Sequence, residues 1–176
     1  MVLSLMGHQN LSDEIILAER GEFYAYTAEF TPDRPVFVLM KCKANKNRPV
    51  EQLPVLGSEA NVLFQFDGFN QARACSVETA KLQGLIDPRV NWQSWVETHL
   101  GLPNISTREF ERICSQKDVD RLVTTCMEVC SKEEKFLDLA EGSIVAVATS
   151  DGKYGLFLLE EISSESILIA ACHVRL

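Results

Sequence analysis

"SIVAVATSDGKYGLFLLEEISSESILIAACHVRL", residues 143–176, is the stretch that decides the fold. Two apolar runs flank Asp151-Gly152, a dipeptide typical of the two-residue type I′ turn of a β-hairpin. A turn of this type predicts that Val147 pairs with Leu156. The same register predicts the pairs Thr149–Tyr154 and Val145–Leu158. The stretch therefore begins with an antiparallel hairpin.

A second turn, at Ser163-Ser164-Glu165, leads into a third strand over about residues 166–174. Side chains alternate between the two faces of a strand, and here both faces are apolar. One face carries Leu168, Ala170, Cys172 and Val174, and the other carries Ile167, Ile169 and Ala171. A sheet with two apolar faces is typically covered on both. We therefore expect a three-stranded β-meander over 143–174 between two other layers.

Residues 119–130 can supply the cover for one of these faces. Their apolar side chains recur at spacings of three and four residues, which is the pattern of a buried helical stripe. The stripe consists of Val119, Leu122, Val123, Cys126, Val129 and Cys130. We expect this helix to pack on the C-terminal meander, close to Cys172.

Two capping boxes mark further helix starts in the middle of the chain. Ser106 is followed by Glu109, and Ser131 is followed by Glu134. In each pair the hydroxyl and the carboxylate can satisfy backbone N–H groups of the first helical turn. The second pair predicts a helix over about 132–140.

An additional helix is predicted immediately after Asn91, which can serve as its N-cap. Gly101 and Pro103 would end this helix. Its shared face would carry Trp92, Trp95, Val96 and His99. The middle segment, 91–141, is therefore expected to be helical throughout.

The N-terminal part, 13–84, is predicted to consist mainly of strands. The expected strands are 22–30, 36–42, 61–66 and 72–78, and Asp67-Gly68 joins the last two as a hairpin. Residues 43–59 show no periodicity and are expected to form a long link. Residues 12–20 fit either a short helix or a strand over 14–18, and we favour the strand.

These segments predict a single α+β domain over residues 1–176. It would contain a strand-rich part (13–84), a helical part (91–141) and the β-meander (143–174). The sheet would be mainly antiparallel, and the N-terminal strands could extend it or close it into a barrel or a roll. Edge strands in the N-terminal half also make a homodimer feasible.

The overall charge and hydropathy restrict the location and the partners. The formal net charge is −8, which disfavours binding to nucleic acid or to an anionic membrane. No apolar run approaches the roughly 20 residues that cross a bilayer. The N-terminal residues lack the basic region of a signal peptide. We therefore expect a cytoplasmic protein that does not insert into a membrane.

One basic segment departs from this acidic background. Residues 31–50 contain five basic side chains and one acidic one, which gives a local charge of +4. The candidate partner-binding residues are Lys41, Lys43, Lys46 and Arg48. A solvated loop would also show this composition. The alternative is an arm that contacts an anionic partner, either a protein or, less favoured, a nucleic acid.

Cys126 and Cys130 are the nearest approach to a chemical motif. They are four residues apart on one helical face, so that both thiols could reach one metal ion. A structural zinc site needs four nitrogen or sulfur ligands, and the sequence offers no second close pair. We therefore interpret both thiols as core packing and expect no metal and no cofactor.

Three residues are candidates for a ligand pocket between sheet and helices: His99, Cys172 and His173. A cysteine–histidine dyad is conceivable, but no nucleophile motif accompanies it. Adjacent Cys172 and His173 would also point to opposite faces of their strand. We therefore assign no catalytic residue.

The sequence is compatible with three functions. The first is a non-enzymatic interaction or regulatory module that binds a protein partner. The second is a small enzyme or a ligand-binding protein with the pocket described above. The third is weak binding of nucleic acid or another anionic partner through residues 41–48.

Overall fold

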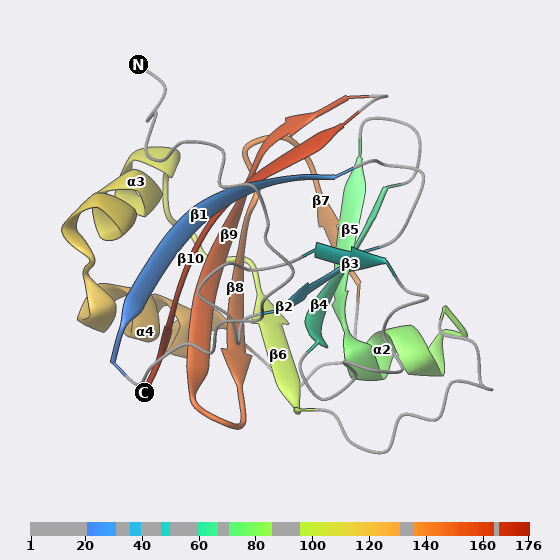
Figure 1. Cartoon of the computed structure of the whole chain (residues 1–176), viewed down its shortest axis with the longest axis horizontal. Coiled ribbons are helices and arrows are strands. Elements are labelled where there is room, and N and C mark those ends of the chain that lie inside the picture. The colour runs from blue at the N-terminus through green and yellow to red at the C-terminus, as the bar shows by residue number, and fades with distance from the viewer. Residues whose placement is uncertain are drawn as a thin grey trace.

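The computed structural model describes residues 21–30, 36–39, 47–49, 60–66, 71–85, 96–130, 136–163 and 166–176 (Figure 1). In this part of the chain the fold is α+β, as predicted. It contains two five-stranded antiparallel sheets and three helices. The C-terminal strands form the predicted meander.

The first sheet joins the two ends of the described chain. Its centre is the meander of β8 (Ile144–Thr149), β9 (Lys153–Ile162) and β10 (Ile167–Arg175). At one edge β1 (Phe23–Phe30) pairs with β10, and at the other β6 (Thr98–Gly101) pairs with β8. The strand order is therefore β1-β10-β9-β8-β6.

The second sheet has the order β3-β2-β4-β5-β7. Its strands are β2 (Val36–Leu39), β3 (Asn47–Pro49), β4 (Ala60–Phe66), β5 (Ala72–Ser76) and β7 (Leu137–Leu139). β4 and β5 pair as the hairpin that the sequence predicts, although Asp67-Gly68 lies outside the described residues. Among the described strands, neither sheet closes into a barrel.

The two sheets share a hydrophobic core. Phe64 of β4 meets Phe157 of β9 edge to face, with the ring centroids 5.8 Å apart. The same core includes Val62, Ala74, Leu137, Val147, Leu159 and Ile169. Burial of one such phenylalanine stabilises the fold by about 1.5–3 kcal/mol. This core covers one of the two apolar faces of the meander.

Two helices, α3 (Thr107–Gln116) and α4 (Val119–Val129), cover the opposite face of the first sheet (Figure 1). Leu122 and Cys126 of α4 share a buried cluster with Leu156 and Cys172 of the meander. The predicted contact between the 119–130 stripe and the meander is confirmed. The predicted cap is also confirmed, because the Glu109 backbone N–H donates to Ser106 Oγ at 3.2 Å.

The β8–β9 hairpin differs by one residue from the predicted register. Val147 pairs with Gly155 and Val145 pairs with Phe157. The turn contains three residues, 150–152, and the Gly152 N–H donates to the Thr149 carbonyl at 3.1 Å. Gly152 has a φ of +81°, the left-handed conformation that ends such a three-residue turn. An Asp-Gly dipeptide serves this turn as well as the two-residue type.

Two predicted helices are strands over their described residues. Residues 98–101 form β6, in which buried Thr98 and Leu100 alternate with a less buried His99. Residues 137–139 form β7, in which Leu137 and Leu139 are buried and Asp138 is exposed. Both segments add a short strand to a sheet edge, so tertiary pairing overrides the local helix signals.

Two predictions in the N-terminal part also need correction. The expected strand 72–78 ends at Ser76, which caps the helix α2 (Val77–Leu82) by accepting the Thr79 N–H at 3.1 Å. The expected structureless link 43–59 contains β3, an edge strand that ends at Pro49. Proline is tolerated there because an edge strand leaves some N–H groups unpaired. The proposed strand 14–18 lies outside the described residues.

Candidate functional site

The inner face of the first sheet, which meets the second sheet, changes from apolar to polar at its hairpin end. Phe157 lies in the shared core. Lys153 is four residues earlier on β9 and therefore points to the same face of the strand. Arg175 stands directly opposite Lys153 on β10. We name this region the polar end cluster, and its members are Tyr24, Thr149, Asp151, Lys153, His173 and Arg175.

Lys153 is a charged group inside the protein. Its side chain is 2% exposed, and its ammonium Nζ lies 2.6 Å from Asp151 Oδ2. Thr149 Oγ1 donates to the other carboxylate oxygen at 2.6 Å. Burial opposes ionisation of Asp151, but the hydrogen bonds from Lys153 and Thr149 outweigh it and hold the pKa of Asp151 below its ordinary value. A buried charge is stable only when it is paired in this way.

His173 is fully buried beside this ion pair. Its ring centroid lies 5.2 Å from that of Tyr24, its cross-strand neighbour, and 6.1 Å from that of Tyr26. Burial and the Lys153 charge lower the pKa of His173 to about 4. The imidazole is therefore neutral at pH 7, with one ring nitrogen as donor and the other as acceptor.

The polar end cluster keeps unused hydrogen-bonding capacity. Among the described residues, neither ring nitrogen of His173 has a hydrogen-bond partner, and the same holds for the buried Nε of Arg175. An unsatisfied buried polar atom costs about 1–3 kcal/mol, so such atoms usually meet a water molecule or a ligand. Chemically, the cluster could bind a small polar molecule, or it could hold or release a proton on His173.

Several cysteine thiols lie on the opposite, helix-covered face. Cys126 and Cys172 are buried there, and Cys126 Sγ donates to the Gly155 carbonyl at 3.3 Å. The contact with Cys126, together with burial, raises the pKa of the Cys130 thiol. A protonated thiol is a poor nucleophile and a poor metal ligand.

The structure does not bring the three predicted pocket residues together. His173 faces the second sheet, whereas its neighbour Cys172 faces the helices. His99 lies on β6, where its Nε2 is 3.3 Å from Glu97 Oε1. β8 and β9 lie between β6 and β10, so about 14 Å of sheet separates the strand of His99 from the strand of Cys172.

Of the predicted partner-binding residues, Lys41, Lys43 and Lys46 lie outside the described residues. Arg48 lies on β3, opposite Phe37 of β2. The backbone of β3 therefore fixes one end of the basic segment at the edge of the second sheet.

Sequence reasoning missed most of the polar end cluster. Lys153, Phe157 and Leu159 fall on the same face of the predicted strand, so a lysine on an apolar face was already visible. The sequence contained no sign that Asp151, in the turn, would reach back to Lys153. Nor could it show that Tyr24, nearly 150 residues away, would lie beside His173.

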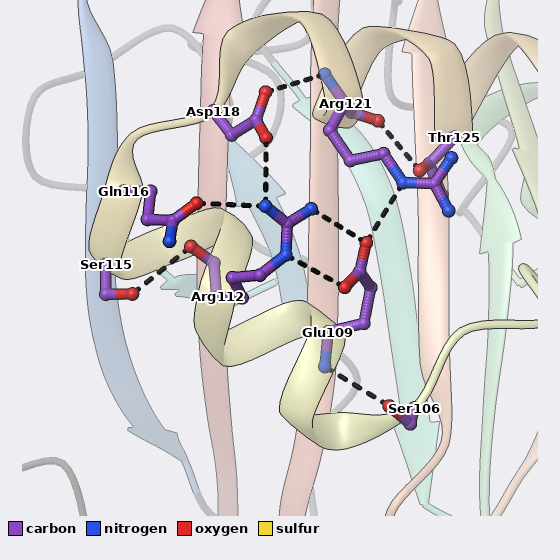
Figure 2. A network of polar contacts seen from close by, with 8 residues as sticks. All are labelled: Ser106, Glu109, Arg112, Ser115, Gln116, Asp118, Arg121 and Thr125. Carbon is purple, nitrogen blue, oxygen red and sulfur yellow. Dashed lines mark hydrogen bonds and ion pairs between the residues drawn. The ribbon is translucent and has the colours of Figure 1, made fainter.

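A second polar group lies on the surface between α3 and α4 (Figure 2). Glu109 accepts hydrogen bonds from Arg112 Nε at 3.0 Å and from Arg121 Nε at 3.1 Å. The bonds from Arg112 and Arg121 lower the pKa of Glu109 to about 2. Arg112 also contacts Gln116 and Asp118 at 2.9 and 3.4 Å. The network ties the two helices together at the solvent side.

Neither a membrane span nor a metal site is found in the described part of the chain. No helix there is long and apolar enough to span a bilayer. The same part contains no group of three or more His, Cys, Asp or Glu side chains arranged to hold a metal ion. No protein-family model, curated protein or solved structure matches this chain.

Proposed function

We propose that this chain is a non-enzymatic interaction or regulatory module of the cytoplasm that binds a protein partner. The observation that carries the proposal is the placement of the cysteine and histidine side chains. Cys126 and Cys172 are buried between the helices and the first sheet, His173 is buried on the other face of that sheet, and His99 lies three strands from Cys172. Groups placed in this way do not converge on a substrate at the surface, and therefore we assign the function to the surface itself.

The junction of β6 and the end of α4 is the surface we favour for this contact. Leu102 and Met127 expose 50% and 67% of their areas there. The backbone of Gly101 packs directly on that of Val129, and Leu102 and Met127 are one and two residues away from this contact along the chain. Exposed methionine and leucine side chains can bury apolar area against a partner.

The test is affinity capture with the purified full chain from an extract of its native cells. A partner bound by the wild type should be lost with Leu102→Glu/Met127→Glu. Leu82→Glu is the matched control, because Leu82 is 69% exposed on α2 and should leave binding intact. Capture that is the same for all three proteins would contradict this surface. Self-association in light scattering, abolished by the double variant, would identify the partner as a second copy.

A second candidate function is the binding of a small anion by the polar end cluster. The unused hydrogen-bonding atoms of His173 and Arg175 favour it. The guanidinium of Arg175 would supply the positive charge, because Lys153 is already paired with Asp151. Thermal-shift measurements with acetate and with inorganic phosphate would test it. Stabilisation of the wild type that disappears in His173→Phe supports binding, and equal responses of the two proteins contradict it.

A further inference from the structure

His173 lies at the contact between β10 and the edge strand β1. It stands directly opposite Tyr24 of β1, and its ring centroid is 5.2 Å from that of Tyr24 and 6.1 Å from that of Tyr26. The residue is fully buried, and among the described residues neither of its ring nitrogens has a hydrogen-bond partner. Two aromatic rings of β1 therefore cover an imidazole that has no partner for an additional proton.

The charged groups around His173 are already engaged or are themselves positive. Lys153 of β9 is buried and paired with Asp151 of the turn. Arg175 lies two residues further along β10 on the same face. The Glu22 carboxylate accepts a hydrogen bond from the tyrosine opposite His173, and the described strands of the second sheet contribute apolar side chains to the shared core. A proton on His173 would therefore create a buried positive charge without a counter-ion, which is strongly unfavourable.

We propose that His173 is an acid-sensitive switch: when its imidazole takes up a proton, β1 separates from β10 while the rest of the first sheet stays paired. Among the described strands β1 has one neighbour, whereas β8, β9 and β10 each pair on both edges (Figure 1). Opening at β1 brings water to His173 with the loss of a single strand pairing. The proposal is independent of both functions proposed above, since β1 and β6 lie at opposite edges of the sheet and no added anion takes part.

The direction of the pH dependence follows from the state that binds the proton more tightly. Burial and the Lys153 charge lower the pKa of His173 to about 4 while β1 is in place. With β1 detached, the imidazole meets water and its pKa returns to the ordinary value of about 6.5. Acid therefore favours the detached state. Between pH 7 and pH 5 the equilibrium constant for detachment should rise about 20-fold.

Detachment would change the edge that the first sheet presents. The backbone groups of β10 that face β1, between Ile167 and Val174, would lose their partners. A row of unpaired N–H and C=O groups is a template for pairing with another strand. Low pH would therefore replace the edge formed by β1 with a central strand that can accept a new neighbour.

Hydrogen–deuterium exchange of the full chain at pH 7 and pH 5 tests the switch. The labelling time is lengthened at pH 5 to correct for the slower intrinsic exchange, and the buffer contains neither acetate nor phosphate. We expect the protection of residues 21–30 to fall about 20-fold at pH 5, while that of β4 and β8 changes little. His173→Gln, which does not titrate, should abolish this response. His99→Gln is the matched control, because His99 lies on β6 and its replacement should leave the response intact.

The switch is wrong if the corrected protection of residues 21–30 is the same at both pH values, or if His173→Gln responds as the wild type does. It is also wrong if β4 loses protection together with β1, because the whole chain or the contact between the sheets would then open. Circular dichroism at pH 7 checks that His173→Gln folds. Lys153→Met is a second variant, which removes the charge beside His173 and should reduce the acid response. An unchanged response in Lys153→Met would count against the switch.

Discussion

Lys153 and Asp151 form an ion pair in which the cation is inside the protein and the anion reaches solvent. The Nζ–Oδ2 distance is 2.6 Å, and the side chains are 2% and 33% exposed. Loss of the carboxylate would leave the ammonium buried without its partner. Breaking a buried pair in this way costs several kcal/mol, whereas replacing it with apolar groups can be nearly neutral.

We therefore expect Asp151→Asn to lower the free energy of unfolding by about 3 kcal/mol. Lys153→Met should cost less, because it removes the buried charge together with its need for a partner. Urea denaturation of both variants at pH 7 measures the difference. If Lys153→Met is the more destabilising variant, the burial of the cation does not control stability here.

Stability should also fall in mild acid because of His173. Its pKa is about 4 in the folded protein and about 6.5 when unfolded, so the unfolded chain takes up a proton first as the pH falls. The free energy of unfolding is therefore highest above about pH 6.5 and falls by about 3 kcal/mol as the pH is lowered toward 4. Denaturation curves at pH 7.5, 6 and 4.5 should show this slope in the wild type and a shallower one in His173→Phe. The same slope in both would contradict the assignment.

The turn between β8 and β9 depends on Gly152. Its φ of +81° strains any residue with a Cβ, and that atom would lie 3.2 Å from the Leu176 carbonyl oxygen. Gly152→Val should therefore destabilise the fold by about 1 kcal/mol or more. The melting temperature measures this effect. Gly21→Val is the control for backbone strain alone, since a Cβ at Gly21 would have no neighbour within 4 Å.

Gly101 tests close packing without backbone strain. A Cβ at this position would lie 2.3 Å from the Val129 carbonyl oxygen, which is far closer than atoms can approach. Gly101→Ala should force β6 and the end of α4 apart at a cost of about 1–3 kcal/mol or more. Chemical denaturation provides the measurement, and a free energy equal to that of the wild type would show that the two backbones separate easily.

The basic segment can be tested by its affinity for a polyanion. Heparin should retain the wild type at low salt, and Lys43→Ala/Lys46→Ala should reduce the retention. Arg108→Ala/Lys117→Ala is a matched control, because both side chains are exposed on or beside α3, outside the segment. An equal reduction in the two double variants would indicate a general charge effect. If heparin does not retain the wild type, the basic segment does not bind polyanions.

The sequence predicted best where a pattern repeats along one element. The two apolar faces of β10 and the stripe from Val119 to Cys130 are local patterns. The first correctly predicts that β10 is covered on both sides, and the second correctly predicts which face of α4 is buried. The register of β8 and β9 was wrong by one residue because Asp-Gly fits turns of two and of three residues. The strands β6 and β7 are short and gain their stability from pairing with a neighbour, so their own residues give little indication of them.

The candidate sites were less predictable for a related reason. His173 was identified from its residue type, but its environment depends on Tyr24, which pairs with it across nearly the whole chain. Asp151 was assigned only to a turn, and its contact with Lys153 arises from the three-residue form of that turn. Side chains that meet through tertiary pairing leave no periodic signal in the sequence.

The position of β10 between β1 and β9 has a consequence for how the protein is made. β1 is synthesised early, yet its pairing partner leaves the ribosome almost 150 residues later. Pairings between residues so distant in sequence close large loops, and folding rates fall as such contacts come to dominate. β1 therefore cannot take its place in the first sheet until β10 has been synthesised. We expect slow folding for a chain of this length, with β1 exposed as an unpaired edge until the last strand is inserted.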